Sequence, residues 1–328
     1  MADVCPACLG ADLTPIERVP IPALARGWSA QPHVAERFSA EQLLDNVRAD
    51  VGADFVDVLR CVRCGMEHMA PMRTWAADHY PVQSHGFGFD HHTALARLRG
   101  GSGTLLEIGC AEGDFLAEAA ALGYRGIGLD FAPASVAAAR AAGRDVRGAG
   151  VHRLTETVGA DAPFDVIAMF QIIEHLETPD ATFDDLARIA RPGTRLVIGC
   201  PSPRRFARAY PHPERVGLSE FWDYPPQHTM RWTPQALRAF LARHGWAVSY
   251  VAEEPFGVIG AAAFLTSSCG RPAGWYHRRG RRRLETLRWM ARLLLTGAPW
   301  RYAGVRLYAE AVRTGPTAAS ASPSPSAA

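Results

Sequence analysis

The sequence predicts an α/β protein built on a doubly wound, mostly parallel sheet, with a small module before that sheet and helices inserted near its end. Three observations support this prediction. Apolar strands alternate with helices between residues 104 and 201, an apolar strand over 104–109 ends in a glycine bend, and two C-x-x-C pairs come before it. Such alternation is typical of parallel sheets that helices cover on both faces. With 328 residues, the chain has room for about two domains.

The composition excludes several classes of protein. Apolar residues make up 48% and charged residues 21%, which is ordinary for a globular protein and excludes wholesale disorder. The formal charge is +2, and a balance so near neutrality argues against a dedicated nucleic-acid binder. All 35 basic residues are arginines. The absence of lysine excludes Schiff-base catalysis and the phosphate-binding lysine of P-loops.

Neither a membrane span nor a signal peptide is expected from the sequence. The chain contains no uncharged apolar run of about 18 residues. Residues 1–5 lack the basic start that precedes the apolar run of a signal peptide. We therefore expect a cytoplasmic location, where paired cysteines are more often metal ligands than disulfides.

Four of the seven cysteines form two close pairs, Cys5 with Cys8 and Cys61 with Cys64, and Gly65 follows the second pair. Two C-x-x-C loops supply the four thiolates of a tetrahedral structural zinc site, which leaves no position open for chemistry. We therefore predict that these four cysteines bind Zn²⁺. Two alternatives stay open. One pair could be a redox motif, although neither has a thioredoxin-like context, or all four could be reduced thiols without a metal.

The segment between the two cysteine pairs is long for a compact zinc ribbon, because 52 residues separate Cys8 from Cys61. The insert must therefore carry structure of its own. Residues 40–49 follow Ser39, a suitable N-cap, and predict a short helix, while residues 55–59 predict a strand that leads into the second pair. Residues 1–72 are accordingly predicted to form a zinc-binding N-terminal domain.

The central segment predicts a series of strands and helices. A helix is expected over 90–99, an apolar strand over 104–109, a helix over 116–122, a second strand over 126–130 and an Ala-rich helix over 133–142. In sheets of this kind, ligands bind at the carboxyl ends of the strands, near the point where the strand order reverses.

The turn after the first of these strands suits a nucleoside ligand that carries a carboxylate or a phosphate. Gly109 and Gly113 let the backbone approach a ligand closely, and the next helix offers free N–H groups and the positive end of its dipole. Asp130 lies 21 residues after Gly109, at a strand end where a carboxylate can bond both hydroxyls of a ribose. The glycine spacing does not fit G-x-G-x-x-G, so a dinucleotide is disfavoured.

Three segments resemble class I S-adenosylmethionine-dependent methyltransferases, in the order in which that family has them. Residues 107–115 (EIGCAEGDF) resemble its first motif, 164–179 (FDVIAMFQIIEHLETP) its fourth strand and E-H-L segment, and 191–201 (RPGTRLVIGCP) its turn into strand five. The cysteine pairs are similar to the zinc-binding domain of a subgroup that includes sugar C-methyltransferases. The resemblance implies a Rossmann-like core with a seven-stranded sheet over residues 73–254 and S-adenosylmethionine as cofactor.

The resemblance also implies which residues hold the cofactor. Gly109 and its loop would hold the methionine end, Asp130 would hold the ribose, and Gln171 would contact the cofactor or line the mouth of the site. The expected cofactor-binding residues are Glu107, Gly109, Cys110, Ala111, Gly113, Phe115, Asp130, Phe131 and Gln171.

Two features depart from the family's pattern. Ala111 stands where the middle glycine usually stands, and its methyl group narrows the room for the methionine moiety. Residues 148–151 lack the acidic residue that often contacts the adenine amino group. We expect backbone groups and apolar side chains such as Phe131 to hold the adenine instead. If both departures matter, the cofactor binds weakly.

Histidines are the candidate bases, since their pKa lies near neutral pH. His175 follows strand four, and a role in orienting the loop is an equally good interpretation. His228 belongs to residues 224–234 (YPPQHTMRWTP), which resemble the P-P-x-H stretch before the family's last core helix, and we take it as the better candidate. Aromatic residues of the same loop are expected to form the acceptor-side wall or ordinary core, with Tyr224 as a further catalytic candidate beside Trp222 and His212.

The last third of the chain predicts two strands separated by a helical insertion. Residues 246–251 predict a strand, and residues 305–312, which alternate, predict the last one. Residues 255–313 are assigned to the helical lid and this last core strand. The basic amphipathic stretch 277–294 would form a solvated lid, contact an anionic membrane surface or grip a phosphate-bearing acceptor, and we favour the lid. Residues 314–328, rich in Ala, Ser and Pro, are predicted to be disordered.

The sequence thus predicts an S-adenosylmethionine-dependent methyltransferase. Its expected partner is a small molecule or a sugar or glycan derivative, with a phosphate group as an option, and a histidine would remove the acceptor's proton. One alternative is a catalytically silent binding protein on the same fold, for which Ala111 is the main argument. A dinucleotide-dependent oxidoreductase is the other alternative, and the glycine spacing disfavours it.

Overall fold

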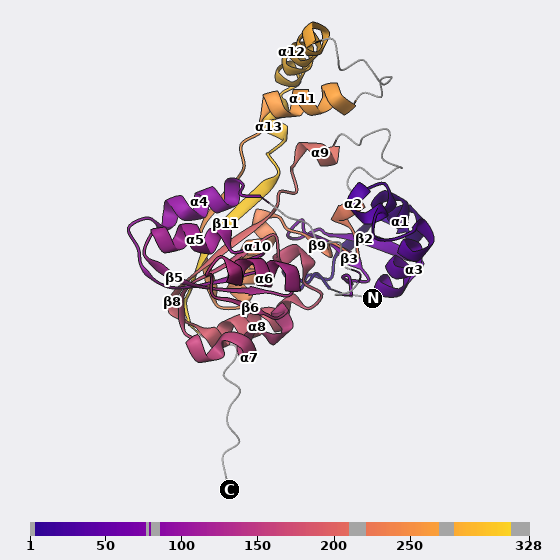
Figure 1. Cartoon of the computed structure of the whole chain (residues 1–328). Coiled ribbons are helices and arrows are strands. Elements are labelled where there is room, and N and C mark those ends of the chain that lie inside the picture. The colour runs from indigo at the N-terminus through magenta and orange to yellow at the C-terminus, as the bar shows by residue number, and fades with distance from the viewer. Residues whose placement is uncertain (1–3, 77–78, 80–85, 210–220, 269–278, 316–328) are drawn as a thin grey trace.

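The structure is a computed structural model that describes residues 4–76, 79, 86–209, 221–268 and 279–315. The larger of its two sheets lies in the middle of the molecule (Figure 1). Among these residues it has seven strands in the order β10-β11-β8-β7-β4-β5-β6. The strands from β8 to β6 run parallel, whereas β11 and β10 are antiparallel to their neighbours. Their bounds are β4 (Gly103–Ile108), β5 (Tyr124–Asp130), β6 (Val146–Gly148), β7 (Phe164–Phe170), β8 (Ala190–Pro201), β10 (Trp246–Glu253) and β11 (Arg306–Arg313). The predicted doubly wound, mostly parallel sheet is confirmed.

Helices cover both faces of this sheet because successive strand residues point to opposite sides. In β4, Leu105 packs into the core on one face and Leu106 into the core on the other. The first face is covered by α4 (Phe89–Leu98), α5 (Asp114–Ala121) and α6 (Pro133–Ala141). The second face is covered by α7 (Leu154–Val158), α8 (Pro179–Ile189) and α10 (Pro234–Arg243).

The order of the strands reverses between β4 and β7, since β5 and β6 extend the sheet from β4 while β8 extends it from β7. The loops that leave the carboxyl ends of β4 and β7 therefore diverge to opposite faces. This divergence opens a crevice where ligands of doubly wound sheets bind.

A second, four-stranded sheet belongs mainly to the N-terminal part, in the order β1-β2-β3-β9. Its strands are β1 (Leu13–Pro20), β2 (Phe55–Cys61), β3 (Glu67–Ala70) and β9 (Met230–Arg231), and it packs beside α1 (Ile21–Ser29), α2 (Pro32–Ala35) and α3 (Ala40–Val51). The expected helix after Ser39 is α3, and Ser39 and Gln42 form its capping box. Strand β9 comes from the core segment of the sequence, so the N-terminal sheet is completed by residues far along the chain.

Three helices near the C-terminus, α11 (Val258–Ser268), α12 (Arg279–Leu295) and α13 (Ala298–Arg301), stand away from both sheets in Figure 1. They pack against one another and against Phe206 of α9 (Phe206–Ala209). Several apolar side chains of this group are exposed: Ile259, Leu284, Leu287, Leu294, Leu295 and Trp300. Residues 277–278 of the predicted basic stretch and 316–328 of the predicted tail lie outside the described residues.

No helix within the described parts of the chain is both long enough and apolar enough to cross a membrane.

Candidate functional site

The loop after β4 takes a shape that only small residues tolerate. Gly109, Ala111 and Gly113 all have positive φ angles, of 73°, 46° and 79°. A Cβ atom on Gly109 would lie 2.1 Å from Cδ1 of Ile172, so glycine is required there. Ala111 adopts the left-handed conformation with its side chain exposed, a state that costs an L-residue roughly 1–2 kcal/mol.

Asp130 joins the loop after β4 to the loop after β5. Its Oδ2 accepts a hydrogen bond from the Ala111 N–H at 2.8 Å, and its Oδ1 accepts one from the Ala132 N–H at 2.8 Å. Each oxygen keeps a second lone pair for a ligand. The carboxylate therefore orders the crevice and faces it at the same time.

The crevice holds two adjoining cavities, of about 350 Å³ and about 200 Å³, which share lining residues and are called here the larger and the smaller part of the pocket. Gly109, Asp130, Phe131, Gln171 and His175 line both parts, together with Ile172. The predicted residues that line only the smaller part are Glu107, Cys110, Ala111 and Phe115. Of the predicted cofactor set, Gly113 alone does not line the pocket. It is the N-cap of α5, so its part is to shape the turn.

Glu107 contributes a buried carboxyl group to the smaller part of the pocket. Its side chain is 4% exposed, and its Oε2 has no hydrogen-bond partner among the described residues. Burial, with the nearby carboxylates of Asp130 and Asp114, raises the pKa of Glu107 well above its usual range. A cationic group of a ligand placed here would relieve both the charge repulsion and the missing hydrogen bond.

The larger part of the pocket is mostly apolar. Leu129, Ile108 and Ala149 line it, with Phe131 at its edge and the backbone of residues 149–151 along one side. No acidic side chain of residues 148–151 is available there, as the sequence indicates. Such a surface suits a flat aromatic ring held by apolar contacts and backbone groups.

Gln171 is held at the junction of the two parts by Asp90, a residue that the sequence did not single out. Gln171 has a positive φ of 57°, and its Nε2 donates to Asp90 Oδ2 at 3.0 Å. Asp90 is fully buried and also accepts from Arg306 at 2.5 Å and contacts His91 Nδ1 at 3.0 Å. Burial alone would raise the pKa of Asp90, but His91 and Arg306 outweigh it and lower the pKa to about 2.

We expect Asp90→Asn to destabilise the protein by about 2 kcal/mol at pH 7, because the pKa of this carboxyl lies below its unfolded value of 3.8. The contribution is present above pH 3.8 and is lost as the pH falls toward 2. Urea unfolding at several pH values should therefore show wild type and variant converging as the pH falls from about 4 to about 2. Asp45→Asn, at a 69% exposed side chain on α3, is the control. A constant difference across this pH range would contradict the assignment.

His175 and His228 lie together beside the junction of the two parts of the pocket, and only His175 lines it. His175 ends the short helix Ile173–His175 after β7 and lines both parts of the pocket. The His228 ring meets it edge-on at 4.6 Å between ring centroids, but His228 is buried and lines neither part. The better base candidate from the sequence therefore lies one ring behind the pocket wall, and its role stays a prediction.

A buried ion cluster holds His228 in place. Its Nδ1 lies 3.1 Å from Asp223 Oδ1, and Asp223 Oδ2 pairs with Arg231 at 2.6 Å and with Arg205 at 2.5 Å. Burial alone would raise the pKa of Asp223, but the two arginines hold it far below its usual range. Burial lowers the pKa of His228, although its bond to Asp223 opposes this. His228 is therefore neutral, and the ionised Asp223 accepts its Nδ1 proton.

Tyr224 packs against the N-terminal sheet, whereas Trp222 lies beside His228. The Tyr224 hydroxyl donates to Glu17 Oε2 at 2.8 Å, and the side chain packs in the core of the N-terminal sheet and lines neither part of the pocket. The half-buried Trp222 ring lies 5.3 Å from His228. His212 lies outside the described residues. The catalytic role expected of Tyr224 is thus untested, and its hydroxyl points to the other sheet.

The N-terminal part extends here to Trp75, whose ring packs into the core of the N-terminal sheet, and it supplies one wall of the pocket, which the sequence did not indicate. Thr74 and Trp75 line the larger part beside Pro226. Glu177 accepts from the Thr74 N–H at 2.6 Å, and Trp75 Nε1 donates to Gln227 Oε1 at 3.0 Å. Both anchors join residues more than 100 positions apart, so no local sequence signal marks them.

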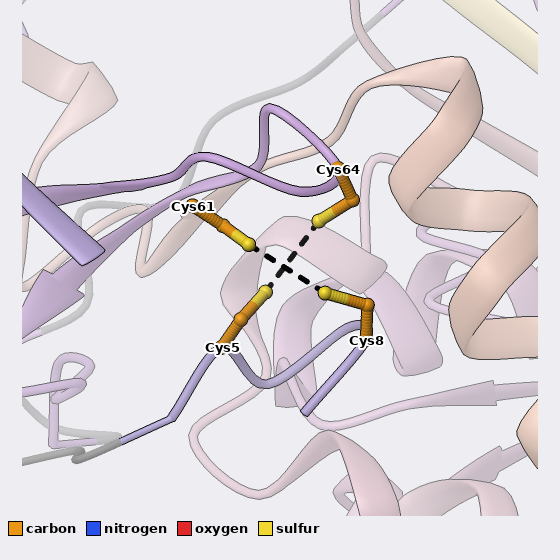
Figure 2. A group of neighbouring side chains, drawn as sticks. All are labelled: Cys5, Cys8, Cys61 and Cys64. Atoms are coloured by element: carbon orange, nitrogen blue, oxygen red, sulfur yellow. Dashed lines mark hydrogen bonds between the residues drawn. The ribbon is translucent and has the colours of Figure 1, made fainter. Parts of the chain in front are cut away.

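The four paired cysteines converge, as Figure 2 shows. The Sγ atoms of Cys5 and Cys64 are 3.6 Å apart, and those of Cys8 and Cys61 are 3.5 Å apart. These separations are too long for disulfides, and they are close to the sulfur–sulfur distance of roughly 3.8 Å that a tetrahedral Cys₄ zinc site requires. The cluster therefore suits a zinc ion in both number and geometry of ligands.

Comparison with known proteins finds similar chains. A family model described as "Methyltransferase domain" matches residues 87–251, half of the chain. A protein of Mycolicibacterium smegmatis named "Probable S-adenosylmethionine-dependent methyltransferase" is 32% identical over 48% of this chain and 56% of its own length. A ubiquinone biosynthesis O-methyltransferase of Caulobacter vibrioides is 31% identical over 47% of this chain and 62% of its own. The chain thus spans little more than half of each relative. An S-adenosylmethionine-dependent methyltransferase structure from Mesorhizobium loti aligns with a TM-score of 0.44 and 22% identity, over 69% of this chain and 99% of that one.

Proposed function

We infer, from the premise that this chain belongs to the methyltransferase domain family, that it transfers a methyl group from S-adenosylmethionine to an acceptor bound beside His175. The observation that carries this inference is the pair of adjoining cavities, with Glu107 in the smaller one and Asp130 and His175 in the wall of both. A cofactor and an acceptor must meet in one enclosed space for an in-line displacement, and this pocket provides it.

The pocket fits the predicted cofactor at both of its ends. The orphaned Oε2 of Glu107 suits an ammonium group, Asp130 suits the ribose hydroxyls, and the apolar wall near Phe131 suits an adenine ring. When bound, S-adenosylmethionine supplies an electrophilic methyl group on a sulfonium. The chain's own residues bind this cofactor, exclude water from it and orient it toward the histidines.

The acceptor is proposed to be a small molecule or a sugar derivative with an acidic hydroxyl or carbon. The name of the ubiquinone biosynthesis O-methyltransferase of Caulobacter vibrioides supports a hydroxyl. His175 contacts the acceptor in this proposal, and neutral His228, oriented by Asp223, draws the proton away through the adjoining ring. A general base placed in this way typically contributes about 10²–10⁴-fold to the rate.

The cysteine cluster is proposed to hold a structural Zn²⁺ ion. Burial raises the pKa of the Cys5 thiol to about 11, so a cation is what would keep this group ionised. The loop that carries Cys5 and Cys8 is fixed to α10 by Arg243, which donates to the backbone oxygens of Ala7 and Pro6 at 3.0 and 2.8 Å. The ion would thus stabilise the contact between the N-terminal sheet and the core.

The partners expected of residues 277–294 stay predictions. Exposed Leu287 and Leu294 of α12 are compatible with contact to an anionic membrane surface, as the sequence pattern suggests. The described residues of α12 line neither part of the pocket. A lid role would therefore require these helices to move.

The proposal is tested by methyl transfer from labelled S-adenosylmethionine to a panel of small hydroxylated and glycosylated acceptors. We expect His228→Ala to lower kcat at saturating acceptor by about 10²-fold, because the neutral imidazole is lost, while the cofactor still binds. His244→Ala, at a ring that pairs with Asp180 away from the pocket, should keep its activity. Near-normal turnover of His228→Ala would remove His228 from this role, and no transfer by wild type to any acceptor would count against the function.

A further inference from the structure

Glu174, His175 and His228 form a cluster whose ligand atoms all lie within 4.8 Å of one another. Glu174 is 1% exposed, and neither of its carboxylate oxygens has a hydrogen-bond partner among the described residues. A buried carboxyl group without partners costs free energy unless a ligand supplies what is missing. The Glu174 carboxyl group therefore lacks a positively charged or donating partner.

The orientation of the His228 ring also leaves one of its nitrogen atoms able to bind a cation. Asp223 is held by two arginines, so it is ionised and only accepts hydrogen bonds, and the proton on the His228 ring is the one on Nδ1. Its Nε2 atom then carries the lone pair. Imidazoles that bind metals show the same arrangement, with one nitrogen bonded to a carboxylate and the other free to bind the ion.

We propose that Glu174, His175 and His228 bind a divalent transition-metal cation. Two imidazoles and one carboxylate form a donor set typical of Zn²⁺, Mn²⁺ or Fe²⁺, and unlike the all-oxygen sets of Ca²⁺ and Mg²⁺. Tetrahedral ligands at about 2.1 Å from an ion lie roughly 3.4 Å apart, so atoms that lie up to 4.8 Å apart here would have to approach one another by as much as roughly 1.4 Å. Three protein ligands also leave a position open, unlike the closed Cys₄ cluster.

The position of this site suggests what the cation does. His175 lines both parts of the pocket, so an ion beside it lies where the two parts meet, next to the position proposed for the acceptor. A cation there favours acceptors that present oxygen atoms, and it stabilises the anionic form of a hydroxyl that is to be methylated. This use of the site rests on the proposed methyl transfer, whereas the binding of the ion does not.

The test is a titration with Mn²⁺ alone of the full chain that carries one equivalent of zinc, enough for the four cysteines only, followed by the electron paramagnetic resonance signal of the free ion. Mn²⁺ prefers oxygen and nitrogen to thiolate ligands, so the cysteine cluster does not compete. We expect one Mn²⁺ per chain in wild type, and affinity at least about tenfold lower in Glu174→Gln and in His228→Gln. Glu156→Gln, at a 66% exposed side chain, should bind as wild type does.

Two outcomes overturn the proposal: wild type that binds no Mn²⁺ at millimolar concentration, or both variants binding Mn²⁺ as wild type does while retaining their zinc. Retained zinc shows that the variants are folded, and the second variant keeps the test valid if Glu174→Gln is not. Calorimetry with S-adenosylhomocysteine on the same samples separates the two proposals. Cofactor binding without Mn²⁺ binding leaves the methyltransferase function standing with the histidines as the direct base, and the reverse result leaves the metal site standing alone.

Discussion

Asp130→Ala is expected to weaken the binding of S-adenosylhomocysteine by at least about 100-fold, as measured by calorimetry. The substitution removes the two hydrogen bonds that tie the Ala111 and Ala132 N–H groups to one carboxylate, as well as the proposed bonds to the ribose. A hydrogen bond to a charged group contributes about 1.5–3 kcal/mol, so the loss of even one ribose bond, with a disordered loop, reaches this range.

The graded variant Asp130→Asn should give a smaller effect, because its amide keeps one accepting oxygen while the other becomes a donor. Asp145→Asn, at a 58% exposed side chain beside Arg147, controls for the loss of a surface charge. Thermal unfolding of each variant separates a lost ligand contact from a lost fold. Unchanged affinity in a folded Asp130→Ala protein would show that Asp130 does not contact the cofactor, whereas wild type that does not bind S-adenosylhomocysteine would favour the scaffold alternative.

The features of the core that could be predicted are those set by neighbours in the sequence. Short apolar runs place β4 and β5, and the positive φ values at Gly109 and Gly113 are a direct consequence of residue type. The place of Asp130 in the crevice was also predictable from its neighbours in the sequence, because it is the last residue of a strand whose carboxyl end faces the crevice. The helix expected over 116–122 begins earlier, at Asp114, because Gly113 ends the loop.

The elements that escaped prediction depend on exceptions to local rules. β1 contains Pro15 and Pro20, which argue against a strand, yet β1 lies at the edge of its sheet, where proline is tolerated. α1 has Pro22 in its first turn and Gly27 near its end, so its sequence resembles a loop. Pro22 is accommodated because the first N–H groups of a helix have no partner within it.

The parts of the site that escaped prediction depend on contacts between distant residues. Asp90 reaches Gln171 across 81 positions of the sequence, and Trp75 reaches Gln227 across 152. The sequence pattern placed His228 near the pocket, but it could not show that the His175 ring lies between His228 and the pocket. How deeply a side chain is buried behind the pocket surface depends on tertiary packing, and the spacing of sequence motifs does not reveal that packing.

The second large effect is expected from Cys61→Ser. We expect wild type to contain one zinc ion per chain by elemental analysis, and this variant to retain less than about 0.1, because a structural site needs all four thiolates. The loop that carries Cys61 and Cys64 is held to the start of α10 by the N-cap residue Thr233, whose Oγ1 donates to the backbone oxygen of Cys64 at 2.7 Å. Loss of the ion therefore loosens the N-terminal sheet from the core and lowers the temperature of unfolding.

This loosening should also reach the pocket, because Thr74 and Trp75 of the N-terminal part line its larger half. Turnover by Cys61→Ser is thus expected to fall even though the cysteines lie outside the pocket. Cys200→Ala, at a buried cysteine in the main core, controls for the loss of a thiol and should keep its zinc. Full zinc retention by Cys61→Ser would show that Cys61 is not a ligand. Wild type isolated without zinc, and unable to bind it when reduced, would leave the four cysteines as unligated thiols.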